Sequence, residues 1–233
     1  MRHTCPAAII IGFSILFLVM VTSGDAFDSF EEGGGPSTPQ AAITALLDGN
    51  DRYVEGKAIA HNRPAAREGL AAGQAPFAAV IRCADSRVAP EIVFDQALGE
   101  LFVCAVAGNV PTPEIVASIE YGVAVLGTKL IVIMGHSSCG AVQAAIENRA
   151  DTSVLPGSLP MLIDQIVAPC AVDIDPDDPE TLNAVTVCNA NEGISKLMKM
   201  SELIKAAVDK GDLKVVAGVQ DLKSGRFKLN KGV

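Results

Sequence analysis

The chain alternates short apolar runs with longer segments in which apolar residues recur every three or four positions. The apolar runs predict buried strands, at 77–82, 101–106, 129–134 and 213–219, with a short edge strand at 226–229. The periodic segments predict helices, at 40–57, 113–126, 139–148, 159–167 and 180–210. This alternation indicates an α/β fold, a mostly parallel central sheet flanked by helices.

The N-terminal segment has a pattern of its own. Residues 7–21 are almost entirely apolar, a run shorter than the roughly 20 residues that span a bilayer. Small residues follow, with Gly24 and Ala26 placed for cleavage before Phe27. We therefore predict a signal peptide at 1–26 and export to the periplasm or the medium. An uncleaved anchor is the alternative, because the flanks of the run are uncharged, and only then do we expect membrane contact.

A polar, acidic, glycine-rich stretch separates this segment from the rest of the chain. Residues 27–38 contain three consecutive glycines and predict a flexible linker. The domain is then expected at 39–233. Thr38 is placed to cap the first helix, with Pro39 at its first position.

Composition excludes one class of partner. Eighteen basic against 27 acidic residues give a net charge of −9, and only 4% of residues are aromatic. Nucleic-acid binding needs a cationic surface or stacking aromatic side chains, so we do not expect it. Apolar residues make up 49% of the chain, enough for a sizeable core.

Six cysteines are present, five of them after the predicted signal peptide, and an odd number is a poor disulfide framework. Cys104, Cys170 and Cys188 are interpreted as core residues or spare thiols, and a disulfide between two of them stays open. His61 is the only histidine after the signal apart from His136. We expect it in a solvated loop rather than in a proton relay.

The remaining cysteines and His136 lie in two short motifs. Cys83 follows a predicted strand, and His136 and Cys139 follow another, three positions apart. Zinc binds thiolate and imidazole ligands in a tetrahedron. The carboxyl ends of parallel strands meet at one edge of a sheet, so these three residues are the predicted zinc ligands. Buried structural cysteines are the plainer alternative.

Three protein ligands leave a fourth position for water, which zinc acidifies to a hydroxide nucleophile. Asp85, two residues after Cys83, is placed to accept a hydrogen bond from that hydroxide. Arg87 is placed to hold Asp85 ionised by a bidentate pair. Asp85 and Arg87 are therefore the predicted catalytic pair. Two alternatives remain: Asp85 as the fourth zinc ligand, closing the site, or a plain ion pair.

The C-x-D-x-R motif at Cys83 and the H-x-x-C-G motif at His136 together resemble the beta-class carbonic anhydrases. The resemblance extends over residues 40–229 and includes four further segments. These are Gly49-Asn50-Asp51-Arg52-Tyr53-Val54, Ala72-Gly73-Gln74-Ala75-Pro76-Phe77, Ala107-Gly108-Asn109 and Leu213-Lys214-Val215-Val216.

The resemblance implies a carbonate dehydratase, a lyase that reversibly hydrates carbon dioxide to bicarbonate. It implies one Zn²⁺ per subunit, with zinc-bound hydroxide as the nucleophile. It implies that Gln74 binds substrate, often across a dimer interface, and that the backbone N–H of Gly140 faces bicarbonate. It further implies homodimers or homotetramers in which N-terminal helices, here 40–70, wrap a neighbouring subunit.

The chain departs from the family at Ala105, where many members have arginine. Some members also have an inhibitory bicarbonate pocket of Trp, Arg and Tyr, and its positions are interpreted here as Val80, Ala105 and Ala217. Their side chains predict that bicarbonate does not regulate the protein through that pocket. Two alternative functions stay open: hydrolysis of carbonyl sulfide or carbon disulfide on the same scaffold, and a catalytically silent zinc-binding protein.

Overall fold

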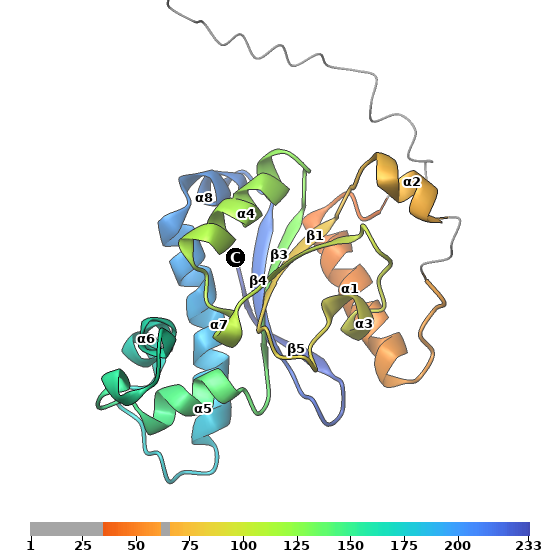
Figure 1. The fold of residues 1–233 in the computed structure, drawn as a ribbon. Helices are drawn as coiled ribbons and strands as arrows, with labels where there is room; N and C mark the ends of the chain where they lie inside the picture. The colour runs from red at the N-terminus through yellow and green to blue at the C-terminus, as the bar shows by residue number, and fades with distance from the viewer. Residues whose placement is uncertain (1–34, 62–65) are drawn as a thin grey trace, which may run out of the picture. The chain divides into compact units, whose positions relative to one another are not determined.

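A computed structural model describes residues 35–61 and 66–233 (Figure 1). The predicted signal peptide, most of the predicted linker and residues 62–65 lie outside the described residues. The described residues belong to one compact unit. Among the described residues, no helix is both long enough and apolar enough to cross a membrane.

The centre of the fold is a sheet of five strands in the order β2-β1-β3-β4-β5. The strands are β1 (Ala78–Arg82), β2 (Leu101–Ala105), β3 (Leu130–His136), β4 (Lys214–Gln220) and β5 (Phe227–Gly232). The first four are parallel, and β5 pairs antiparallel with β4. Every residue of β3 is buried, as expected for a central parallel strand. The mostly parallel sheet is therefore confirmed.

Helices cover both faces of this sheet (Figure 1). They are α1 (Pro39–Val54), α2 (Ala66–Ala72), α3 (Pro90–Val93), α4 (Pro113–Ala124), α5 (Gly140–Glu147), α6 (Leu159–Cys170), α7 (Thr181–Met200) and α8 (Glu202–Asp209). Two 3-10 turns, η1 (Ala107–Asn109) and η2 (Thr152–Val154), complete the described elements. Residues of α1, α3, α5 and α6 form the core on one face, and α4, α8 and most of α7 form the core on the other.

Two helix boundaries follow directly from local chemistry. The Thr38 hydroxyl accepts a hydrogen bond from Ala41 N–H and Pro39 begins α1, so the predicted cap is confirmed. The single helix predicted at 180–210 is wrong, because α7 ends and α8 begins at Ser201. That serine is extended, and its hydroxyl accepts from Ile204 N–H, the geometry of a new N-cap.

The Gly49-Asn50 segment holds α1 on the chain's own sheet. The side chain of Asn50 donates to the carbonyls of Val93 and Gly225 and accepts from Phe227 N–H. A Cβ on Gly49 would lie 1.7 Å from the carbonyl oxygen of Phe94, so only glycine permits this approach. Wrapping of a neighbouring subunit by residues 40–70 stays a prediction.

Two expectations about isolated residues are wrong. The interpretation of Cys170 and Cys188 as core residues or spare thiols is wrong, because they form a disulfide that joins the end of α6 to α7, the alternative that had stayed open. Cys104, in contrast, is a buried free thiol in the core, as interpreted from the sequence. His61 is not a solvated loop residue, since it is half-buried with Nε2 3.1 Å from a carboxylate oxygen of Asp95.

Candidate metal centre

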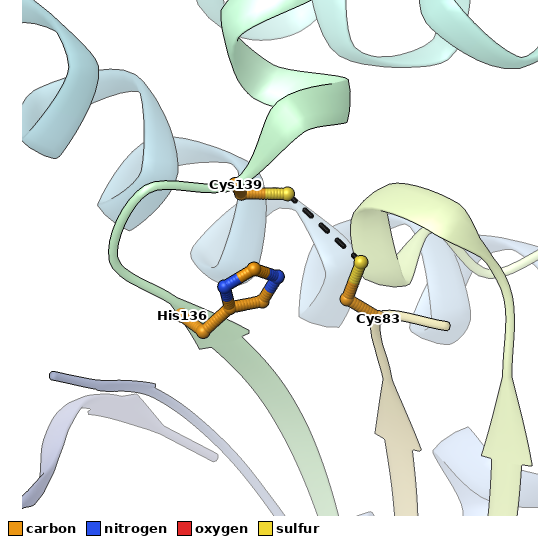
Figure 2. A group of neighbouring side chains, drawn as sticks. All are labelled: Cys83, His136 and Cys139. Atoms are coloured by element: carbon orange, nitrogen blue, oxygen red, sulfur yellow. Dashed lines mark hydrogen bonds between the residues drawn. The ribbon is translucent and has the colours of Figure 1, made fainter. Parts of the chain in front are cut away.

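Three residues converge because of where their strands end. Cys83 directly follows β1, His136 is the last residue of the neighbouring β3, and Cys139 is the N-cap of α5. The chain turns back between His136 and Cys139 at Ser138, whose φ of 55° lies in the left-handed region. This turn brings Cys139 over the carboxyl edge of the sheet, beside Cys83 (Figure 2).

The geometry of this group fits a tetrahedral zinc ion. The ligand atoms of Cys83, His136 and Cys139 all lie within 4.8 Å of one another. The two sulfurs are 4.0 Å apart, and Zn–S bonds of about 2.3 Å in a tetrahedron would place them about 3.8 Å apart. All three side chains are buried, with exposed fractions of 5%, 0% and 1%.

The imidazole of His136 is oriented for coordination. Its Nδ1 lies 2.9 Å from the carbonyl oxygen of Ser137, a hydrogen bond in which the ring nitrogen donates and which leaves the lone pair on Nε2. Nε2 is buried and has no hydrogen-bond partner among the described residues. A buried nitrogen in that state is costly unless something binds it. With two cysteines beside it, the donor set fits zinc.

The protein also favours the thiolate form that zinc requires. Hydrogen bonding from the Cys139 thiol lowers the pKa of Cys83 well below its usual range, although burial acts in the opposite direction. The backbone N–H of Gly108, 3.3 Å from the Cys83 sulfur, lowers it further. The two cysteine thiols therefore lose their first proton readily, and a bound cation would displace the second proton.

Asp85 and Arg87 lie beside this group. Arg87 donates from Nε and Nη2 to the two carboxylate oxygens of Asp85, at 2.9 and 2.7 Å, and its backbone N–H donates a third bond at 2.9 Å. The side-chain bonds are the main reason that the pKa of Asp85 lies below its usual range, against the effect of burial. Oδ2 of Asp85 is 3.9 Å from His136 Nε2. In this structure, therefore, Asp85 is paired with Arg87.

The two predicted substrate-binding residues lie in different places. Gly140 is the first residue of α5, next to Cys139, and nothing lies within 4 Å of where a Cβ would be. Gln74 precedes β1, whereas Cys83 follows it, and β1 alone spans roughly 13 Å. Gln74 is exposed and lines a hollow of 540 Å³ that contains none of the predicted zinc ligands.

The three positions interpreted as the bicarbonate pocket do not form one pocket. Val80 belongs to the core on one face of the sheet, and Ala217 belongs to the core on the other. Ala105 is exposed at the end of β2. Assigning Ala217 to the same pocket as Val80 is therefore wrong, because the sheet separates them.

Comparisons with known proteins agree with this geometry. Residues 78–227 match the family model described as carbonic anhydrase. "Carbonic anhydrase 2" of Mycobacterium tuberculosis is 40% identical over 201 residues, covering 83% of this chain and 94% of that protein. The chain belongs to the carbonic anhydrase family.

Solved structures identify the class within the family. The Coccomyxa beta-carbonic anhydrase in complex with acetazolamide is 26% identical, with a TM-score of 0.63, over 82% of this chain and 87% of that one. Tetrameric beta-carbonic anhydrases from Sordaria macrospora include a chain 28% identical, with a TM-score of 0.61, over 82% and 98%. This carbonic anhydrase is thus of the beta class, consistent with zinc-dependent hydration of CO2.

Several residues that support the site were not predicted from the sequence as site residues. Gly108 has a φ of 76° and donates to the Cys83 sulfur, and its carbonyl accepts a hydrogen bond from the buried Asn189 at 2.8 Å. The carbonyl of Ser138 accepts from Arg87 at 3.3 Å. The Ala107-Gly108-Asn109 motif was a sequence signal for Gly108. Asn189 lies in the middle of α7, where no local motif indicates its role.

Proposed function

We propose that this protein catalyses the reversible hydration of carbon dioxide to bicarbonate, with Cys83, His136 and Cys139 holding one zinc ion per chain. The observation that carries the proposal is the convergence of three buried ligand atoms, one of them the unpartnered Nε2 of His136, beside the Asp85–Arg87 pair. A purely structural site would need no such pair. Bound zinc supplies the Lewis acid that acidifies a water molecule near neutral pH.

The chain's own residues position the reaction. Asp85, kept ionised by Arg87, accepts a hydrogen bond from the attacking oxygen and directs its lone pair toward the carbon of CO2. Gly140 is exposed and begins α5, so its N–H, at a helix N-terminus, suits an oxygen of bicarbonate. Burial of the ligand side chains excludes bulk water and strengthens these polar contacts.

We further propose that the active unit is a homodimer, alone or as half of a tetramer, in which Gln74 serves the zinc site of the partner subunit. Gln74 lies at the opposite end of β1 from Cys83, so it is badly placed to serve its own site. Within the described part of the chain, β2 is an edge strand that has a neighbouring strand on one side only. Exposed apolar side chains lie near this edge: Leu98 precedes β2 by three residues, and the ring of Tyr121 packs against Phe102 of β2.

Export is the remaining part of the proposal. The sequence of residues 1–26 supports a signal peptide with release to the periplasm or the medium. The Cys170–Cys188 disulfide supports the same destination, because such bonds persist in oxidising compartments.

The decisive experiment is stopped-flow CO2 hydration by zinc-loaded residues 27–233 at pH 7 and pH 9. Turnover at both values would support the proposal and an open site. Turnover at pH 9 alone would support a site that Asp85 closes at neutral pH. Stoichiometric zinc without turnover at either value would contradict the proposal. Carbonyl sulfide and carbon disulfide would then be assayed in turn, and inactivity on all three would identify a silent zinc protein.

A further inference from the structure

Arg82 is bound to the segment that carries both a zinc ligand and the catalytic carboxylate. It is the last residue of β1, and its Nη1 donates to the carbonyl oxygens of Cys83 at 2.7 Å and of Asp85 at 3.3 Å. The pairings of β1 with β2 and with β3 both end at Arg82. The carbonyl of Cys83 therefore lies beyond the sheet and takes its hydrogen bond from this guanidinium.

The two carbonyls lie on either side of Ala84, so one guanidinium nitrogen cross-links the short segment from Cys83 to Asp85. A guanidinium suits this task because it is planar, always charged and presents its donors in a fixed arrangement. The Nε of Arg82 is buried and finds no hydrogen-bond partner in the described part of the chain. Burying this N–H without a hydrogen bond costs free energy, which the two bonds to the carbonyls must outweigh.

The strand neighbours of Arg82 do not compete with those carbonyls for its guanidinium. Its neighbours in register are Ala105 on β2 and the fully buried Met134 on β3, neither of which carries a charge. Residues in register on adjacent strands project on the same face of the sheet. An arginine placed at position 105 would therefore reach the same space from the next strand.

We propose that Arg82 is a positioning residue that fixes the Cys83–Asp85 segment and thereby keeps the Asp85 carboxylate on Arg87 rather than on the metal. This inference rests on the proposed zinc site. Only a small movement separates the two arrangements, since Oδ2 of Asp85 already lies 3.9 Å from the Nε2 of His136. The Arg82 bonds act beside the Arg87 pair and two backbone bonds, from Ala84 N–H to the Val106 carbonyl and from Val88 N–H to the Asp85 carbonyl. The Arg82 guanidinium is the group that joins the Cys83 carbonyl to the Asp85 carbonyl.

The test compares Arg82→Met, which has no donors, with Arg82→Lys and with the double variant Arg82→Met/Ala105→Arg. Arg149→Met is the matched control, because Arg149 Nη1 also donates to a backbone carbonyl, that of Ile146, at 2.9 Å on α5. Each zinc-loaded protein is measured for zinc content and kcat/KM for CO2 hydration at pH 7. A crystal structure at that pH then locates the Asp85 carboxylate.

We expect Arg82→Met to keep its zinc, to lose about tenfold in kcat/KM, and to show Asp85 turned from Arg87 toward the metal. Arg82→Lys should retain part of the activity, the double variant should recover most of it, and the control should match the wild type. Wild-type activity in Arg82→Met with Asp85 still on Arg87 would overturn the inference. A loss of kcat/KM that matches a loss of zinc, and that neither Arg82→Lys nor the double variant recovers, would also overturn it.

If Arg82→Met does not fold, Arg82→Lys and the double variant decide the question by the position of Asp85 and the recovery of activity. Failure of the proposed function is separately visible. A wild type that binds zinc but does not hydrate CO2 removes the function, while the position of Asp85 in the crystal structures still tests Arg82.

Discussion

Asp85 and Arg87, two residues apart on one turn, are joined by two side-chain hydrogen bonds of 2.9 and 2.7 Å. Two guanidinium nitrogens, Nε and Nη2, donate to the one carboxylate, and a third bond comes from the backbone N–H of Arg87. Such a bidentate pair fixes the orientation of the carboxylate as well as its charge. The exposed fraction is 17% for Asp85 and 54% for Arg87, so the carboxylate faces the buried zinc ligands while the arginine faces outward.

The first prediction concerns the charge of this carboxylate. Asp85→Asn keeps the size of the side chain but replaces an ionised acceptor with a neutral amide. We expect kcat/KM for CO2 hydration to fall by about 10²-fold or more, with zinc content unchanged. Stopped-flow kinetics and metal analysis on the same sample measure both quantities. Asp173→Asn, at an exposed position outside the site, should leave both unchanged.

The second prediction separates a ligand cysteine from a core cysteine. Cys83→Ser should lose zinc as well as activity, because a hydroxyl does not replace the thiolate ligand. Cys104→Ser is the matched control, since Cys104 is also buried but lies on the other face of the sheet, where burial raises the pKa of its thiol. Equal zinc content in the two variants, measured after dialysis against a chelator, would contradict the ligand assignment.

The third prediction concerns the disulfide. Five cysteines follow residue 26, and two of them form the Cys170–Cys188 bond. Alkylation of the unfolded, metal-free protein without reductant should therefore modify three thiols, and alkylation after reduction should modify five. Reduction should lower the free energy of unfolding by about 3 kcal/mol for a loop of 18 residues. Five reactive thiols before reduction would contradict both the bond and its support for export.

The fourth prediction is an acid-sensitive contribution to stability from Asp95, whose side chain is 3% exposed. Burial opposes ionisation, but hydrogen bonds from Arg52 Nε, at 2.5 Å, and from Ile59 N–H outweigh it and lower the pKa of Asp95. A lowered pKa in the folded state stabilises the protein above the unfolded value of about 4. That contribution is lost as pH falls through the folded pKa.

Asp95→Asn should therefore lower the free energy of unfolding by about 1–3 kcal/mol at pH 7, and the difference should shrink below pH 4. Asparagine also tolerates the left-handed backbone at this position, where φ is 47°. Urea titrations at pH 3.5, 5 and 7 measure the effect. Asp209→Asn, which breaks an exposed pair with Lys205, should change stability by no more than about 0.5 kcal/mol. A difference independent of pH would contradict the assignment to charge.

The sheet and the zinc ligands could be predicted because their signals are local. Long apolar runs such as 129–134 identify central strands, and Cys83, His136 and Cys139 lie immediately after two of them. Once those strands are known to be adjacent and parallel, the meeting of their carboxyl ends follows. The helix break at Ser201 also has a local cause, the N-cap of α8. It was not predicted because apolar residues keep their helical spacing on both sides of Ser201.

Other features depend on contacts that no local pattern carries. The Cys170–Cys188 bond requires α6 and α7 to pack together, and the spacing of 18 residues does not indicate that they do. The position of Ala217 depends on the register of β4, where a shift of one residue moves a side chain to the opposite face. His61 owes its burial to Asp95, which lies 34 residues further along the chain.

The fifth prediction tests whether subunits exchange Gln74. Because Gln74 and Cys83 lie at opposite ends of β1, each zinc site of the proposed dimer takes its glutamine from the other chain. Gln74→Ala should therefore lower activity without loss of zinc, and Cys83→Ser should abolish both. In a mixed dimer of these two variants, the ligands of the first chain and the Gln74 of the second make one complete site.

The two variants are mixed, dissociated, reassociated and assayed with each variant alone as the reference. We expect specific activity above the mean of the separate variants, because that complete site forms only in the mixed dimer. Gln74→Ala mixed with Asp85→Asn should recover in the same way and keep full zinc content. Activity equal to the mean in both mixtures, with mixed dimers shown by native mass spectrometry, would mean that Gln74 does not act across subunits.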